Sequence, residues 1–221
     1  MTYDRYKLRL SSYGNTIEDS QVKSTIYNLT QSFKESPSYR QIYINNIATD
    51  CRIIDTDKSF EKKLLFLPGI SKDIGEVAVI DDENWLIIDS QSNEMFSKAL
   101  IQRCNETLRW IDANDVTQEY PCVITKTTLS SFDENKFIQL LDNKLYLFVS
   151  NDENTIIIKP KTRIVLGKQV YGIVGMDDVT ISGLIQFNLE TVPIDKDDDF
   201  VNNIADNEGL YELPTGGGSL W

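Results

Sequence analysis

Residues 163–190 read RIVLGKQVYGIVGMDDVTISGLIQFNLE and carry the clearest β pattern in the chain. Two β-rich runs flank Gly167-Lys168, and glycine at the first position of a two-residue loop is typical of a type II′ hairpin. The last six residues alternate apolar and polar, which directs Ile185, Phe187 and Leu189 to one buried face. The stretch therefore predicts an antiparallel hairpin followed by a half-buried strand.

The same period of two recurs from Arg40 onward, in the runs RQIYIN, CRIID, KKLLFLPGI, GEVAVI, NWLIID, CVITKTT, KLYLFV and TIIIKP. GEVAVI and NWLIID are joined by the acidic group Asp81-Asp82-Glu83, which predicts a solvated polar turn. Residues 92–112 fit either a helix face or a long bent strand, and we favour the strand because its neighbours are β-rich. About ten short strands at hairpin spacing indicate an antiparallel β-barrel or a sandwich.

The two ends of the chain differ from this β region. Residues 16–34 predict an amphipathic helix: Thr16 stands in the N-cap position, and an apolar stripe repeats at 4-3-4 spacing. That stripe consists of Val22, Ile26, Leu29 and Phe33. The last residues, LYELPTGGGSLW, place three glycines between apolar anchors, which indicates a tether. Residues 131–142, SFDENKFIQLLD, fit a short second helix.

These patterns predict a mainly β protein with three parts. Residues 1–39 form an N-terminal arm with the amphipathic helix, residues 40–190 a β-barrel domain, and residues 191–221 an acidic C-terminal arm with a Gly-rich tether. The four apolar anchors of the tether are candidate docking residues on a neighbouring subunit, because large aromatic side chains are enriched at interface hot spots. They are Tyr211, Leu213, Leu220 and Trp221.

Composition excludes the commonest catalytic sites. The chain contains no histidine, which removes Ser-His-Asp and Cys-His nucleophiles and nearly every transition-metal site. Its three cysteines, Cys51, Cys104 and Cys122, lack metal-ligand spacing and are expected to be small buried hydrophobes. No Gly-rich phosphate loop is present. We therefore expect no cofactor, no metal and no catalytic residues.

Charge is unevenly distributed. The net charge is −12, and from Glu190 onward eight acids stand against one base, which leaves −7 on that segment. Its densest part, DKDDDF, contains Asp195, Asp197, Asp198 and Asp199, which we interpret as an acidic cluster facing solvent or a channel. A calcium loop is the alternative, although the glycine and glutamate that such a loop needs are missing. A net negative charge opposes stable binding of nucleic acid, because the phosphates carry the same sign.

No apolar run approaches the length of a membrane span, and MTYDRYKLRLSSYG lacks the apolar core of a signal peptide. We expect a protein that stays in the cytoplasm where it is made and binds no membrane.

Several stretches together resemble a known class of protein. In order they are SPSYRQIYIN, GEVAVIDDENWLIID, SKALIQRCNETLRW, RIVLGKQVYGIVGMDDVTISGLIQFNLE and the acidic DKDDDFVNNIAD. This order resembles the neck proteins of tailed bacteriophages, of the head-closure or head–tail connector type, mainly those of phages with Gram-positive hosts. The similarity spans about residues 5–206. It implies a small β-barrel that assembles as a ring beneath the portal, bridges head to tail, and lets DNA pass.

From this resemblance we expect a structural virion protein, made in the host cytoplasm, that is not an enzyme. Its expected partners are further copies of itself in a ring, portal or adaptor proteins, tail proteins, and DNA that passes without specific binding. The alternatives are a β-rich tail or adhesion module that binds a carbohydrate or protein, and a hydrolase that works through paired carboxylates.

Overall fold

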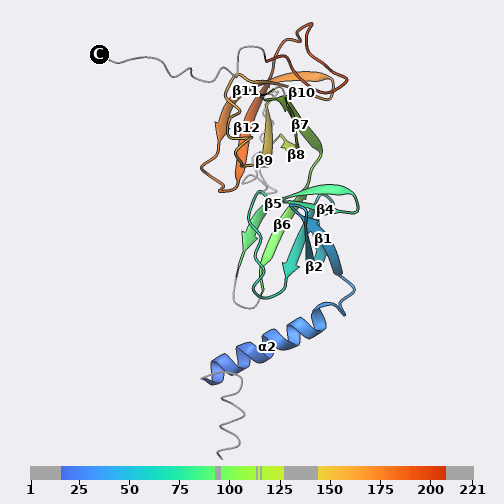
Figure 1. Cartoon of the computed structure of the whole chain (residues 1–221), viewed down its shortest axis with the longest axis vertical. Coiled ribbons are helices and arrows are strands. Elements are labelled where there is room, and N and C mark those ends of the chain that lie inside the picture. Colours follow the sequence, from blue (N-terminus) through green and yellow to red (C-terminus); the bar gives the residue numbers. More distant parts are fainter. Residues whose placement is uncertain (1–15, 93–95, 113, 115, 127–143, 208–221) are drawn as a thin grey trace, which may run out of the picture. The chain divides into compact units, whose positions relative to one another are not determined.

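A computed structural model describes residues 16–92, 96–112, 114, 116–126 and 144–207 (Figure 1). Within these ranges the chain forms one helix, α2, over Ile17–Phe33 and is otherwise built from antiparallel strands. The strands are β1 (Tyr39–Ile44), β2 (Ile47–Asp55), β3 (Glu61–Phe66), β4 (Val77–Ile80), β5 (Glu83–Gln91), β6 (Lys98–Arg103), β7 (Glu106–Ile111), β8 (Thr117–Thr125), β9 (Leu145–Ser150), β10 (Arg163–Leu166), β11 (Gln169–Asp177) and β12 (Leu184–Thr191). The predicted mainly β class is confirmed.

The chain divides into two compact units. Unit 1 comprises residues 1–82 and 87–102, and unit 2 comprises residues 83–86 and 103–221. The range 40–190, expected from sequence as one barrel domain, contains two six-stranded sheets. The physical reason is that hairpin spacing counts strands but does not reveal which strands close on one another.

Unit 1 contains a closed barrel with the strand order β1-β2-β3-β6-β5-β4. Two of its hairpins use two-residue loops with both residues in the left-handed region: Asn45-Asn46 between β1 and β2, and Asp81-Asp82 between β4 and β5. This backbone is that of a type I′ turn, which suits the right-handed twist of the flanking strands. The predicted turn at residues 81–83 is confirmed, although Glu83 already belongs to β5.

Helix α2 begins where the sequence predicts. The Thr16 side chain accepts a hydrogen bond from the Asp19 amide at 3.1 Å and so caps the first turn. At the other end, Arg52 of β2 donates to the carbonyls of Ser32 (2.7 Å) and Phe33 (3.1 Å). A cation at a helix C-terminus also interacts favourably with the helix dipole. The last turn of α2 is therefore held to the first barrel.

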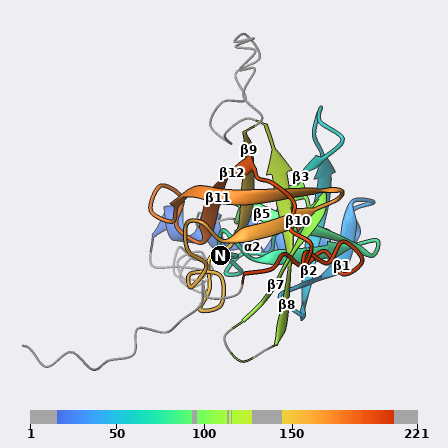
Figure 2. The same cartoon turned by 90° about the horizontal axis from the view of Figure 1, so that it is seen from above.

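Unit 2 contains a six-stranded sheet in the order β10-β11-β12-β9-β8-β7 (Figure 2). The hairpin at Gly167-Lys168 is confirmed: Leu166 pairs with Gln169, and Gly167 has φ +61°. The inward face predicted for β12 is also confirmed, since Ile185, Phe187 and Leu189 are fully buried. They belong to a core cluster that includes Trp110 and, from β9, Leu147 and Val149.

Residues 92–112, for which strand was favoured over helix, do form strands. They contain β6 and β7, separated by Cys104-Asn105, so the long strand is interrupted rather than bent. The predicted second helix at residues 131–142 lies outside the described residues. Among the residues that are described, no helix is both long enough and apolar enough to span a membrane.

Candidate functional site

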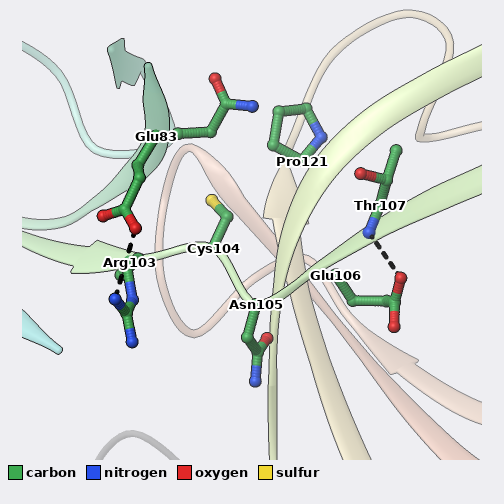
Figure 3. A pocket seen from close by; sticks show the side chains of 8 residues that line it. Glu83, Arg103, Cys104, Asn105, Glu106, Thr107 and Pro121 are labelled. Atoms are coloured by element: carbon green, nitrogen blue, oxygen red, sulfur yellow. Dashed lines mark hydrogen bonds and ion pairs between the residues drawn. The ribbon is translucent and has the colours of Figure 1, made fainter. Parts of the chain in front are cut away.

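A shallow polar pocket of about 510 Å³ lies in unit 2 (Figure 3). Its lining comes from the start of β5, the junction between β6 and β7, and the middle of β8. The residues are Glu83, Asn84, Arg103, Cys104, Asn105, Glu106, Thr107 and Pro121. All eight belong to unit 2, and six of them carry polar or charged side chains other than a thiol.

The floor of this pocket is shaped by Asn105, which interrupts the strand. Its side-chain amide donates to the Ile124 carbonyl (2.9 Å) and accepts from the Ile124 amide (2.8 Å), so it imitates a paired backbone unit. The Asn105 amide itself donates to the Cys122 carbonyl at 3.2 Å. Pro121 has no amide hydrogen, and β8 pairs with β9 only from Val123 onward. The local sequence thus ends one strand and begins the next at this point.

The charged groups of the pocket already have partners. Arg103 pairs with Glu83 at 3.4 Å, and a Glu106 carboxylate oxygen accepts from the Thr107 amide at 3.2 Å (Figure 3). Burial raises the pKa of the Cys104 thiol to about 12, which keeps it protonated and a poor nucleophile at neutral pH. The arrangement can therefore offer hydrogen bonds and a paired charge to a ligand.

All three cysteines were expected to be buried; Cys104 is only half-buried, whereas the other two fit the expectation. Cys51 and Cys122 are buried, and burial raises the pKa of both thiols, to about 12 for Cys51. Trp85 and Trp110 lie in the core and are 2% and 1% exposed. Within the ranges that the structure covers, no group of three or more acidic or cysteine residues is arranged to hold a metal ion.

The acidic cluster of the C-terminal arm is placed on unit 2. Asp195 and Asp197 are exposed, as predicted for solvated acids. Asp198 differs: its side chain is fully buried and accepts from Arg163 Nη2 at 2.7 Å. The same carboxylate accepts from the amides of Asp195 (2.7 Å) and Asp206 (3.0 Å). Asp198 therefore organises the arm and does not face solvent or a channel.

Arg163 and Asn207 were not singled out by sequence reasoning, yet they attach the arm to the sheet. Arg163 also donates to the carbonyls of Pro193 (3.0 Å) and Asp206 (3.3 Å). The Arg163 backbone exchanges two hydrogen bonds with the Asn207 side chain, at 2.7 and 2.8 Å. The only hint in the sequence was one arginine at the start of a strand, with an acid-rich segment downstream.

Apolar contacts fasten the same arm. Ala205 is buried with Val165 and Val170, and Val192 packs against them. Gly172 makes this approach possible, because a Cβ at that position would lie 2.9 Å from a Val192 methyl group. Residues 191–207 are thus folded onto the β10–β11 hairpin by both polar and apolar contacts.

Asp199 closes a small hairpin loop in the arm. It forms an isolated antiparallel bridge with Ile204, and its carboxylate accepts from the amides of Val201 (2.8 Å) and Asn202 (3.0 Å). Hydrogen bonds from Asn202 and Val201 hold the pKa of Asp199 below its usual value. The loop carries Phe200 and Val201 outward, and Val201 is 91% exposed. The predicted docking residues Tyr211, Leu213, Leu220 and Trp221 lie outside the described residues.

Comparison with known proteins locates one match. Residues 106–190 match the model of the YomX C-terminal domain, a phage-associated family represented in Bacillus prophage. This segment is therefore similar to a phage-associated domain. The matched range begins with the first residue of β7 and ends one residue before the end of β12, so it coincides with the six-stranded sheet of unit 2. No curated protein and no solved structure matches the chain.

Proposed function

We propose that this chain is a structural virion protein of the phage neck, and that it catalyses no reaction. In this role it forms part of a ring that joins the portal of the head to the tail and lets DNA pass during ejection. The observation that carries the proposal is the match of unit 2 to a phage-associated domain, together with the sequence resemblance to neck proteins over most of the chain. Its partners are further copies of itself, the portal or adaptor, and tail proteins.

The charge distribution supports passage of DNA without binding. Unit 2 contains 20 acidic and 10 basic residues, a net charge of −10, whereas unit 1 contains 14 and 12, a net charge of −2. A surface that repels phosphates denies DNA a deep binding minimum. The pocket contributes to the non-enzymatic part of the proposal, since its thiol is protonated and its two carboxylates are already hydrogen-bonded or ion-paired.

The test is the solution mass of the purified chain, alone and mixed with portal rings, compared with a chain that ends at Asn207. The proposed function predicts that the full chain forms rings or joins the portal ring. If the shortened chain does so poorly, the terminal segment acts as a strap between subunits. If both assemble equally well, the neck role stands without the strap. Monomers that ignore the portal would contradict the neck role.

A second candidate function, a tail or adhesion module that binds a carbohydrate or protein, is favoured by the pocket. Its volume lies within the range of about 300–1,000 Å³ common for ligand sites, and its lining is mostly polar. This candidate predicts that a monomer binds glycans in a screen, and that Arg103→Ala weakens that binding. Unchanged binding in the variant would exclude this pocket as the site.

A further inference from the structure

The outer wall of the first barrel carries an unusual surface, which we call the basic face. Strand register places Arg52, Leu65 and Lys98 in one row across β2, β3 and β6. Ile54, Lys63 and Leu100 form the next row. These residues alternate with the row of Ile53, Leu64 and Ala99, of which Leu64 and Ala99 are buried, so they point to the outside of the barrel. Cationic and aliphatic side chains therefore alternate within this surface of six residues, both along and across the strands.

The basic face stands out because its lysines have no acidic partner among the described residues. Four other lysines of unit 1 are ion-paired: Lys34, Lys58, Lys62 and Lys72. Lys63 and Lys98 are exposed, and Lys98 instead lies 4.9 Å from the centre of the Phe96 ring. Ile54, which pairs with Lys63 across β2 and β3, is 41% exposed. Arg52 already donates to the carbonyls of Ser32 and Phe33, so the cations of this face that remain without an acidic partner among the described residues are Lys63 and Lys98. Two such lysines beside an exposed isoleucine suit an occupant that is both acidic and apolar.

The chain presents such a surface on unit 2, in residues 194–201, which we call the arm loop. Three of its apolar side chains are exposed: Ile194 (60%), Phe200 (37%) and Val201 (91%). Two exposed carboxylates, Asp195 and Asp197, stand between them. Lys196 lies 3.9 Å from Asp197, a weak contact between exposed groups, and offsets one of these two negative charges.

The arm loop is also held in one shape before any partner arrives. The buried Asp198–Arg163 pair anchors its middle, and the Asp199–Ile204 bridge closes its tip. A loop that is already ordered loses less conformational entropy on binding than a flexible one. This favours a specific contact over a solvated acidic run.

We propose that the arm loop of one copy of this chain docks on the basic face of another copy. Because the two surfaces differ, the contact is heterologous, and repetition of a heterologous contact generates a closed ring when the rotation allows it. The inference rests on the proposed function for the ring, and it assigns the residues that hold neighbouring subunits together. DNA would satisfy the cations of the basic face but would leave the exposed Ile54 unmatched.

The experiment uses charge reversal on the full chain. Variant A carries Lys63→Glu and Lys98→Glu, and variant B carries Asp195→Lys and Asp197→Lys. All four side chains are exposed, so both variants keep their cores. The control carries Lys159→Glu and Lys168→Glu, which make the same charge change as variant A at exposed positions of unit 2 outside the arm loop. Sedimentation velocity and native mass spectrometry measure self-association.

We expect the affinity of self-association of each variant alone to fall by about tenfold or more relative to wild type, because like charges then face each other. A mixture of A and B should regain association with strict alternation, since each acidic face then meets a basic loop. A chain with all four changes should regain it alone. Higher salt should weaken the wild-type contact, and the control should behave as wild type.

Three outcomes would overturn the contact. One is that variant A alone and variant B alone both assemble as wild type does. The neck role would then stand, with the subunits in contact through some other surface. Another is loss of binding to a DNA duplex by variant A with unchanged self-association, which would assign the basic face to DNA. The third is a wild-type chain that stays monomeric at every concentration. In that case, the wild-type chain is mixed with portal rings to test the proposed neck function separately. Only a failure of the chain to join the portal rings would contradict that function as well.

Discussion

Units 1 and 2 are both built from six antiparallel strands, but they differ in what is attached to the strands and in charge. Unit 1 is a closed, nearly neutral barrel whose appendage is an N-terminal helix held by Arg52. Unit 2 has a net charge of −10 and a C-terminal arm folded onto its β10–β11 hairpin. The phage-associated match covers the sheet of unit 2. The difference shows that two six-stranded scaffolds in one chain carry different surfaces and appendages.

The largest expected effects come from the two cores. Phe66 of unit 1 and Phe187 of unit 2 are both fully buried. Phe66→Ala and Phe187→Ala should each lower the free energy of unfolding by about 3–5 kcal/mol, through lost burial and the cavity left behind. Because each unit has its own compact set of contacts, each change should shift one of two calorimetric transitions. A single transition that both changes shift equally would show that the units unfold together.

The next largest effect is expected from the Arg163–Asp198 ion pair, which attaches the arm to the sheet of unit 2. None of the ion pairs described in unit 1 contains a fully buried carboxylate. Arg163→Met leaves the Asp198 carboxylate buried without its cation, which costs about 3 kcal/mol. Hydrogen exchange should then rise at Val192 and Ala205. Arg109→Met is the matched control, since its pair with Glu119 is partly exposed and worth about 0–1 kcal/mol. Unchanged exchange in the Arg163 variant would mean that apolar contacts alone hold the arm.

Substitutions in the hairpin loops of the two units are expected to change the free energy of unfolding by about 1 kcal/mol. Gly167→Ala in unit 2 forces a Cβ into a left-handed conformation and should destabilise by about 1–2 kcal/mol. In unit 1, Asp82→Gly should stabilise by up to about 1 kcal/mol, because Asp-Gly is favoured in type I′ turns. Urea unfolding of the two variants measures both signs. A loss of stability in Asp82→Gly would show that the Asp82 side chain contributes more than its backbone strain costs.

The smallest effects are those of pH and salt on two carboxylates. A hydrogen bond from Lys34 is the main cause that lowers the pKa of Asp50 in unit 1, whereas backbone and side-chain donors of the arm loop lower that of Asp199 in unit 2. A lowered folded-state pKa stabilises the fold above the unfolded value, near 3.8, and this stabilisation is lost as pH falls through the folded value.

Carboxyl NMR titrations at low and high salt test this pair. Salt should move the pKa of Asp50 back towards its usual value, because Lys34 is exposed, and should leave Asp199 almost unchanged. Equal salt sensitivity of the two groups would contradict the assignment of neutral donors to Asp199.

Local patterns predicted the elements well. Thr16 marked the start of the helix, Gly167-Lys168 marked a hairpin, and the alternation of IQFNLE predicted which side of β12 is buried. Each of these depends on residues close together in the chain, where capping, turn preference and the period of a strand act directly. The segment 92–112 was harder, because Asn105 interrupts it through a hydrogen-bond pair with Ile124, nineteen residues away.

The candidate sites depended on distant pairings instead. The pocket joins residues from β5, the β6–β7 junction and β8, and no local motif connects them. In the sequence, Asp198 cannot be told apart from the neighbouring aspartates, because its ion-pair partner Arg163 stands thirty-five residues earlier. Lys63 and Lys98 lie diagonally across β3 and β6, because the register pairs Lys63 with Leu100 and Leu65 with Lys98.

By itself, therefore, the sequence determined the mainly β class, the position of α2, the main turns, the absence of histidine chemistry and the acidic balance. All of these follow from composition or from interactions within a few residues. The tertiary structure alone decided that the strands form two sheets, that Asp198 is buried, and that cations and aliphatic groups share one face of the first barrel. Those outcomes depend on which strands pair and in which register, and such long-range choices are made by the packing of the whole core.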